Sequence, residues 1–358
     1  MKFIHCADLH LDSKIDTLPA EKSKIRREEI LHAFERLCEY ASINGVSAVI
    51  IAGDMFDTSR VTQRTRNRVM QVIRQNSSID FLYLSGNHDE DNFISTTDNL
   101  PNNLKIFGEK WTSFRYDGVV ISGIKLTPYN VKTVYDSLSL VKEDVNIVVL
   151  HGQVAGYKVV ERAELISLPR LKEKNIDYLA LGHIHEHSIG ELDLRGKFAY
   201  SGCLDGRGFD EIGDKGFVLL DVNEHSIDYQ FVPFSSRNFT VFEYNVDRVS
   251  DWLCAKAEIL DYLKNNVSDK NLVKVVLKGQ RKADFDIDVQ GLSMRLNELF
   301  FFAKVYDKTQ ILIEESDYEL DKSVRGEFVR AVWESDLDSE LKSKILTCGL
   351  NALKGEEP

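Results

Sequence analysis

Five apolar runs within the first 185 residues each end in a short polar signature, and this repetition restricts the fold more than any other feature. A continuous apolar run is typical of a strand that is buried on both faces of a parallel sheet. The runs with their polar endings occupy residues 3–10, 49–57, 81–89, 148–152 and 179–185. Because ligands of open α/β sheets collect beyond the carboxyl ends of the strands, we expect the five endings to converge. The pattern therefore predicts an α/β fold with one polar site.

The polar endings contain the residue types that a dinuclear metal site needs. Two divalent ions about 3.5–4 Å apart can activate water and stabilise both oxygens of a phosphoryl displacement. The candidate ligands are Asp8, His10, Asp54, Asn87, His151, His183 and His185. Any one of them alone is more often a polar core group or a turn former, so the prediction depends on the complete, ordered set. Mixed ligation of this kind suits Mn²⁺ or Fe²⁺ better than a structural zinc, and Mg²⁺ stays an alternative.

The order of these motifs resembles that of the calcineurin-like metallophosphoesterases. The shared order is D-x-H, G-D-x-x-D, G-N-H-D, H-G and G-H-x-H. The opening at residues 3–12 is similar to the narrower group of SbcD-type DNA repair nucleases, including their YhaO-like branch. Residues 151–156, 200–204 and 215–217 are also similar to that group. The motifs span residues 8–185, and the general resemblance reaches about residue 315.

The resemblance implies a role for each matching residue. It assigns Asp8, His10, Asp54 and His185 to a first metal ion, and Asp54, Asn87, His151 and His183 to a second, with Asp54 bridging the two. His88 matches the family's non-ligand histidine, which protonates the leaving oxygen or stabilises the phosphorane-like state, as suits a group that titrates near neutrality. Asp57 and Asp89 match carboxylates that orient the ligands. The implied reaction is hydrolysis of a phosphodiester by water activated at the dinuclear centre.

Three further residues are candidates for substrate contacts. A helix is predicted over about residues 60–75, with a cap at Thr58 or Ser59, and it carries several arginines. Its simplest interpretation is a solvated helix face. Because the helix starts just past Asp54, however, Arg60 and Arg64 are candidates for phosphate contacts. His187, which follows the H-x-H motif, is a third candidate, with packing or plain surface exposure as the alternative.

The remaining sequence predicts the flanking elements and a change of architecture after residue 236. Helices are expected at 21–43, 130–142 and around 160–174, and antiparallel strands at 197–201, 216–222 and 227–233. The first helix is expected to bury Ile25, Ile30, Leu31, Phe34, Leu37 and Tyr40. The predicted fold class is a two-sheet metallophosphoesterase sandwich flanked by helices, with a small α+β capping domain and C-terminal helices. The predicted domains are 1–236 (nuclease domain), 237–316 (capping domain) and 317–358 (helical segment for partner docking).

The charge of the chain bears on its partners. The net charge is −12, whereas a self-sufficient binder of duplex DNA usually has a basic domain. If nucleic acid is the substrate, metal ions, local arginines or a partner must supply positive charge, and we expect weak, salt-sensitive DNA binding by the chain alone. The sequence contains no run of about 18 consecutive apolar residues, so no membrane span is expected, and no signal peptide is visible. Five scattered cysteines suit a reducing cytoplasm, so a cytoplasmic location is expected.

Three functions are compatible with this sequence. The leading hypothesis is an Mn²⁺-dependent DNA exonuclease/endonuclease subunit that acts on duplex ends or single strands together with an SbcC-like ATPase partner. The resemblance implies that the amphipathic helices at 322–354 could dock on that ATPase, with packing on their own capping domain as the alternative. It also implies a homodimer, for which the helices at 21–43 and 60–75 are the candidate surface. The alternatives are a phosphodiesterase for nucleotides or cyclic nucleotides, and a scaffold that binds DNA ends or a partner without cleaving.

Overall fold

The five apolar runs form strands β1, β2, β3, β7 and β10 of the computed structural model. The structure describes residues 1–57, 61–87, 89, 100–155, 165–223, 226–247, 249, 251–282, 285–312 and 318–354. The chain divides into two compact units, Met1–Asn238 and Phe239–Pro358. The predicted three-domain boundaries at 236 and 316 stay predictions.

The first unit contains two six-stranded sheets. The first sheet has the order β14-β13-β1-β2-β3-β4. Strands β1 to β4 are parallel to one another, whereas β13 runs antiparallel to both of its neighbours, β1 and β14. Its strands are β1 (Lys2–Cys6), β2 (Val46–Ala52), β3 (Asp80–Leu84), β4 (Leu104–Phe107), β13 (Gly216–Val222) and β14 (Ile227–Pro233). The second has the order β11-β12-β10-β7-β6-β5, with antiparallel strands at both edges. Its strands are β5 (Thr112–Tyr116), β6 (Val119–Gly123), β7 (Val145–His151), β10 (Tyr178–Gly182), β11 (Ser188–Glu191) and β12 (Lys197–Tyr200).

The two sheets pack face to face through one apolar core. This core contains Ile50 and Leu82 from the first sheet together with Ile147 and Ala180 from the second, all fully buried. The outer face of the second sheet is covered by the loops at 124–138 and 166–176, through Leu150, Leu181 and their neighbours. The predicted two-sheet sandwich is confirmed.

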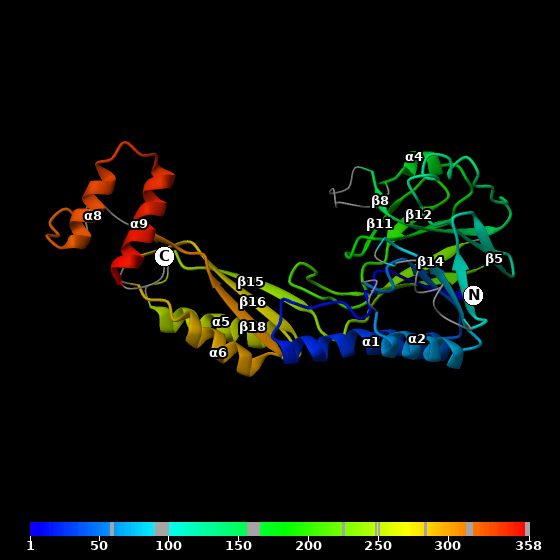
Figure 1. The fold of residues 1–358 in the computed structure, drawn as a ribbon, viewed down its shortest axis with the longest axis horizontal. Helices are drawn as coiled ribbons and strands as arrows, with labels where there is room; N and C mark the ends of the chain where they lie inside the picture. The colour runs from blue at the N-terminus through cyan, green and yellow to red at the C-terminus, as the bar shows by residue number, and fades with distance from the viewer. Residues whose placement is uncertain are drawn as a thin grey trace. The chain divides into compact units, whose positions relative to one another are not determined.

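Helices α1 (Ala20–Ile43) and α2 (Gln63–Gln75) lie side by side along the first sheet (Figure 1). Phe34 of α1 is fully buried and its ring lies 6.3 Å from that of Phe81 in β3. The predicted inner face of α1 is wrong at Ile25, which is 44% exposed, because Arg26 takes the buried position through an ion pair with Asp205. The predicted cap of α2 is also wrong: the helix begins at Gln63, and Thr62 accepts the hydrogen bond from the backbone N–H of Thr65.

Two other helix predictions fail in the first unit. Residues 129–137 form a series of turns instead of a helix, because the side chain of Asn130 accepts from the backbone of Thr127 and donates to that of Lys125. Such local bonds compete with helical hydrogen bonding. Of the helix expected around 160–174, the described part contains only α4 (Leu168–Leu171), preceded by β9 (Leu165–Ile166), which pairs with β8 (Gln153–Val154). Pro169 occupies the first turn of α4, where its missing N–H costs nothing.

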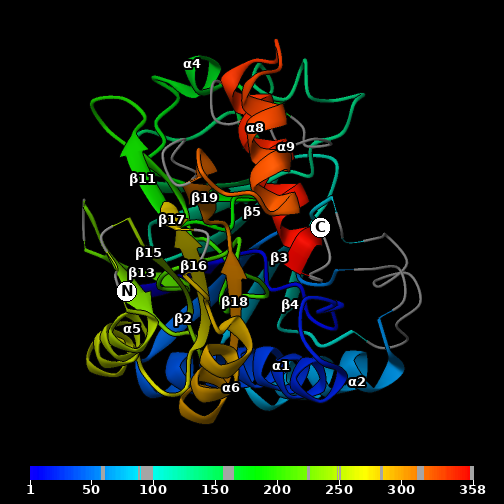
Figure 2. The ribbon, with the colours of Figure 1, turned by 90° about the vertical axis from the view of Figure 1, so that its left-hand side faces the viewer.

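The second unit is a small α+β structure. Its parallel sheet has the order β15-β16-β18, and helices α5 and α6 pack on it around Ile259, Val275 and Leu292 (Figure 2). Strands β17 and β19 form a separate pair, and helices α8 and α9 pack together around Val329 and Leu350. The elements are β15 (Phe239–Asn245), α5 (Trp252–Asn266), β16 (Leu272–Lys278), β17 (Gln280–Lys282), α6 (Val289–Leu299), β18 (Phe302–Asp307), β19 (Gln310–Leu312), α8 (Val324–Trp333) and α9 (Ser339–Lys354). None of the helices in the described part of the chain has the length and apolar character needed to cross a membrane.

Candidate metal centre

The loops that follow β1 and β2 are joined by backbone hydrogen bonds that bring their polar residues together. The backbone N–H of Asp8 donates to the carbonyl oxygen of Gly53, and that of His10 donates to that of Asp54, each at 3.0 Å. Asp8, His10, Asp54 and His183 all have positive φ angles, of 52°, 43°, 51° and 103°. Non-glycine residues in such conformations cost about 1–3 kcal/mol each and cluster at functional sites. The positive φ angles therefore orient these side chains at a cost in backbone strain.

Glycines next to the polar residues are required by close approach. At Gly53, where φ is +97°, an added Cβ would lie 2.0 Å from His151 Nδ1. At Gly182, an added Cβ would lie 1.9 Å from the carbonyl oxygen of Ala52. The glycines of the G-D and G-H motifs thus let the ends of β2, β7 and β10 meet across the two sheets.

One group of candidate ligands consists of Asp8, His10 and His185, whose ligand atoms lie within 4.8 Å of one another. The Nε2 atoms of His10 and His185 face each other at 3.1 Å. The Nδ1 atom of each ring lies against a carboxylate oxygen, of Asp57 at 3.1 Å for His10 and of Glu211 at 2.7 Å for His185. Glu211 accepts the Nδ1 proton of His185, which leaves the Nε2 lone pair of this ring directed at His10 Nε2. The Asp57 carboxylate places negative charge beside His10 Nδ1, which favours the same arrangement in the His10 ring, with both Nε2 lone pairs directed at one point. A cation at that point would satisfy both lone pairs.

The second group consists of Asp54, His151 and His183, which also lie within 4.8 Å of one another. His151 Nδ1 donates to the carbonyl oxygen of Ala52 at 2.9 Å, and its Nε2 lies 2.9 Å from Asn87 Oδ1 and 3.5 Å from Asp54 Oδ2. Asp54 Oδ2 also lies 3.9 Å from His10 Nε2, so this carboxylate faces both groups. The structure thus brings together all seven predicted ligands.

The two histidines of the second group have opposite pKa shifts in the metal-free protein. Burial lowers the pKa of His151, but the Asp54 carboxylate outweighs burial and raises that pKa to about 9. Burial and the neighbouring His151 lower the pKa of His183 to about 4. His183 Nε2 is buried and has no hydrogen-bond partner among the described residues. A donor set of imidazoles, carboxylates and one amide oxygen, with a buried nitrogen that lacks a hydrogen-bond partner among the described residues, fits a divalent metal ion.

Asp57 and Asp89 lie where they can hold ligand-bearing loops. Asp57 Oδ1 contacts His10 Nδ1 as described above, and it lies 3.4 Å from Arg207 Nη1. Asp89 accepts hydrogen bonds from the backbone N–H groups of Met55 (3.1 Å), Phe56 (2.8 Å) and Gly86 (3.0 Å). Burial and the nearby Asp54 charge raise the pKa of Asp89. Asp89 therefore ties the loop after β3 to the loop that carries Asp54.

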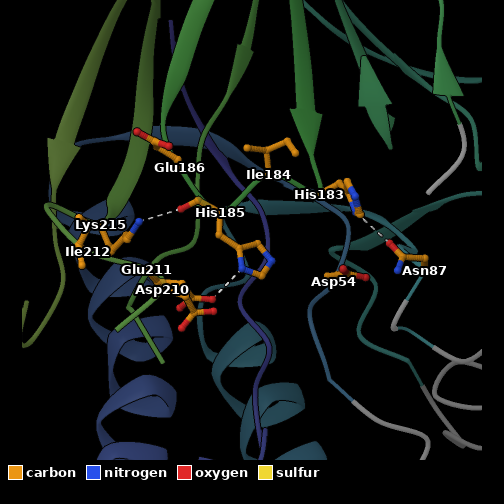
Figure 3. Close-up of a pocket in the computed structure, with 10 residues that line it drawn as sticks. All are labelled: Asp54, Asn87, His183, Ile184, His185, Glu186, Asp210, Glu211, Ile212 and Lys215. Carbon is orange, nitrogen blue, oxygen red and sulfur yellow. Dashed lines mark hydrogen bonds and ion pairs between the residues drawn. The ribbon is translucent and has the colours of Figure 1, made fainter. Parts of the chain in front are cut away.

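Four of the seven candidate ligands line a cleft of about 490 Å³ (Figure 3). Its lining residues are Asp54, Asn87, His183, Ile184, His185, Glu186, Asp210, Glu211, Ile212 and Lys215. Four of these come from the segment between β12 and β13, to which the sequence assigned no site residue. Only the tertiary structure shows that this segment returns to the metal centre. In the sequence, its charged residues cannot be distinguished from charged residues of an ordinary exposed loop.

Two of the predicted substrate contacts, Arg64 and His187, are not among the residues that line this cleft. Arg64 is 78% exposed and pairs with Glu28 of α1 at 3.5 Å. Its neighbour Arg68 pairs with Glu28 and Glu35 of the same helix. His187 donates from Nδ1 to the carbonyl oxygen of Tyr200, and its ring stacks on that of Phe231 at 4.3 Å. The predicted positions His88 and Arg60 lie outside the described residues.

The sandwich and the polar loops define a phosphoesterase, and comparison with known sequences agrees. The profile of the calcineurin-like phosphoesterase family matches residues 1–187, more than half of the chain, and the protein belongs to this family. The DNA double-strand break repair protein Mre11 of Sulfolobus acidocaldarius is 24% identical over 335 residues, covering 88% of this chain and 85% of that protein. The metallophosphoesterase YhaO of Bacillus subtilis is 26% identical over 245 residues, 64% of this chain and 60% of that protein. A dimetal phosphatase from Danio rerio of known structure is 10% identical, covers 64% of this chain and 98% of that one, and has a TM-score of 0.41.

Proposed function

We propose that the protein is a phosphodiester hydrolase with a dinuclear metal centre. The observation that carries this proposal is the position of Asp54, which faces both candidate ligand groups within one cleft. A carboxylate placed in this way can bridge two ions. Asp8, His10, Asp54 and His185 would hold the first ion, and Asp54, Asn87, His151 and His183 the second. Two divalent ions supply an activated water and neutralise charge on the phosphoryl oxygens.

The protein's own residues then have distinct tasks. Asp57 would orient His10 through Nδ1, and Asp89 would hold the Asp54 loop through its three backbone contacts. His88 is proposed as the proton donor to the leaving oxygen, on the grounds of its motif. The cleft volume of about 490 Å³ is in the range of sites that bind a small ligand or one nucleotide unit.

DNA is the substrate that we propose first, with Mn²⁺ as the metal. Support comes from relatives named for DNA double-strand break repair, one of which is similar over 88% of this chain. On this proposal the chain is the exonuclease/endonuclease subunit of an SbcCD-like repair complex. Arg60 and Arg64 remain proposed phosphate contacts, and His187 a proposed substrate contact.

The end of the chain supports a proposed ATPase partner. Although α8 and α9 share a buried core, several apolar side chains near them stay exposed: Leu320 (88%), Val324 (74%), Leu353 (49%) and Leu341 (41%). Apolar faces of this kind often mark a partner surface. We propose that they contact an SbcC-like ATPase. Homodimerisation through α1 and α2 also stays a proposal.

A second candidate substrate is a small phosphodiester such as a cyclic nucleotide. The cleft exposes Glu186 and Asp210, and the whole chain carries a net charge of −12. Negative charge beside the reacting phosphorus disfavours a polyanion and favours a substrate with a single phosphodiester.

One panel tests the proposal. The purified protein with Mn²⁺, Mg²⁺ or EDTA is offered labelled duplex DNA, single-stranded DNA, cyclic nucleotides and a generic phosphodiester. Asp54→Asn should abolish hydrolysis, whereas Asp117→Asn should not, although it makes the same chemical change at an exposed residue that also has positive φ (39°). Metal-dependent cleavage of DNA supports the nuclease, and cleavage of cyclic nucleotides alone supports the second candidate. A chain that binds no divalent metal would refute both.

A further inference from the structure

The segment between β12 and β13 holds His185 at several points. Glu211 Oε1 lies 2.7 Å from Nδ1 of the ring, and Lys215 Nζ donates to the carbonyl oxygen of His185 at 3.0 Å (Figure 3). Cys203 Sγ donates to the same carbonyl oxygen at 3.6 Å. Arg207 Nη2 lies 3.2 Å from Nδ1. The imidazole nitrogen thus has two charged neighbours of opposite sign.

These two neighbours make opposite demands on the ring. A carboxylate accepts a proton from Nδ1, which leaves the Nε2 lone pair directed at His10. A guanidinium can only donate, so it requires the lone pair on Nδ1 and places the proton on Nε2. In the second tautomer, Nε2 cannot bind a metal ion.

We propose that Glu211 is the positioning residue that fixes His185 in its metal-binding tautomer against the competing donation from Arg207. The proposal rests on the metal centre of the proposed function. Glu211 Oε1 lies closer to Nδ1 than Arg207 does, and it also accepts from Arg207 Nη2 at 2.9 Å. Glu211 therefore satisfies the guanidinium as well, and keeps it from the ring nitrogen.

The carboxylate is itself firmly placed. Glu211 is 6% exposed, and its Oε2 accepts from the backbone N–H of Arg207 at 2.7 Å. Two residues before Arg207, Asp205 forms a fully buried ion pair with Arg26 of α1 at 2.6 Å. Arg26 also donates to the carbonyl oxygen of Gly206 at 2.7 Å. The loop is thus anchored to α1 directly beside the residues that control His185.

In the second ligand group, His151 is oriented by the backbone instead of by a side chain. His151 Nδ1 donates to the backbone carbonyl oxygen of Ala52, which no substitution at Glu211 removes. Loss of Glu211 should therefore weaken one metal position and spare the other. If Glu211 acted only through its negative charge, or if its loss unfolded the protein, both metal positions would be weakened.

Titration calorimetry with Mn²⁺ on the full chain tests the proposal. Glu211→Ala should weaken the position formed by Asp8, His10 and His185 about 10- to 100-fold, the usual effect of removing a partner of a metal-bound histidine. Glu211→Gln should bind much more tightly than Glu211→Ala, because the amide oxygen can take the Oε1 position that faces both donors. Asp210→Asn is the control, since it removes the same charge from an exposed neighbour that lines the same cleft.

A double variant separates the competing donor from simple charge loss. Removing Arg207 from the Glu211→Ala background should restore part of the lost affinity, because Nδ1 is then free to carry the proton. Circular dichroism and the melting temperature verify that each variant is folded. Should Glu211→Ala not fold, Glu211→Met takes its place in each comparison, because methionine has a similar length but offers no oxygen to Nδ1 or to Arg207. Equal affinity of Glu211→Ala and wild type, or equal weakening by Glu211→Gln and Glu211→Ala, overturns the proposal. Absence of Mn²⁺ binding by the wild type would instead refute the proposed function.

Discussion

The position of His151 at the metal centre can be tested most directly with two glycine-to-alanine substitutions. Both introduce the same kind of backbone strain, but the two glycines differ in their surroundings. Gly53 and Gly118 have similar left-handed φ angles, +97° and +84°. An alanine Cβ at Gly118 meets nothing within 4 Å, whereas at Gly53 it lies 2.0 Å from His151 Nδ1. Gly118→Ala therefore measures the strain alone, and Gly53→Ala measures strain together with displacement of a proposed ligand.

The magnitudes follow from these contacts. Placing a non-glycine residue in this conformation costs about 1–3 kcal/mol, and both variants should show this loss of unfolding free energy. In Gly53→Ala the ring of His151 must also retreat from 2.0 Å to the 3.4 Å of ordinary contact. Its hydrogen bond to Ala52 is then lost, which costs about 0.5–1.5 kcal/mol more. Displacement of a reacting group by about 1 Å can lower a rate by about 100-fold.

Urea unfolding, Mn²⁺ titration and phosphodiester hydrolysis measure these three effects. Gly118→Ala should retain the metal affinity and activity of the wild type. Gly53→Ala should be the less stable of the two, bind Mn²⁺ at least about 10-fold more weakly and lose about 100-fold in rate. If Gly53→Ala keeps wild-type metal affinity and rate, His151 does not belong to the metal centre.

Three further predictions concern protonation and buried charge. The pKa of His151 is raised to about 9, so its contribution to the stability of the metal-free protein is present below pH 6.5 and is lost as the pH rises through 9. Because His151 must lose this proton to bind a metal ion, Mn²⁺ binding at pH 7 should release a proton. Identical titration heats in buffers of different ionisation enthalpy would contradict this. Burial lowers the pKa of His5 to about 3, so its neutral form stabilises the fold above pH 6.5, and this contribution is lost as the pH falls toward 3. Urea unfolding should show about 2 kcal/mol of this loss between pH 7 and pH 5, absent in His5→Gln. Asp205→Ala should cost about 3 kcal/mol, because it removes one of the two carboxylates that pair with the buried Arg26 guanidinium and leaves Glu29 as the other, and an unchanged melting temperature would disprove that role.

Local patterns in the sequence predicted the strands and the seven candidate ligands, and the resemblance to metallophosphoesterases supplied the two-sheet arrangement. A strand buried on both faces requires a continuous apolar run, and β2 and β7 are such runs. The polar residues follow these strands directly, and within each sheet the rule that parallel strands end at one edge brings them together. Because β1, β2 and β3 belong to one sheet and β7 and β10 to the other, the single site also required the two sheets to pack face to face. The failed helix at 130–142 shows the limit of this reasoning, since the side chain of Asn130 provided a local alternative to helical bonding.

By itself, then, the sequence determined which strands form and which polar residues follow them. Tertiary structure decided what supports those residues. It buried Arg26 of α1 against Asp205, paired Arg68 of α2 with Glu35, and brought Glu211 to Nδ1 of His185. These contacts join residues that are far apart in the chain, and charged residues carry no local periodicity that identifies their partners. Whether a charge is buried, paired or exposed depends on the fold around it, and so the orientation of His185 could be seen only after the chain had folded.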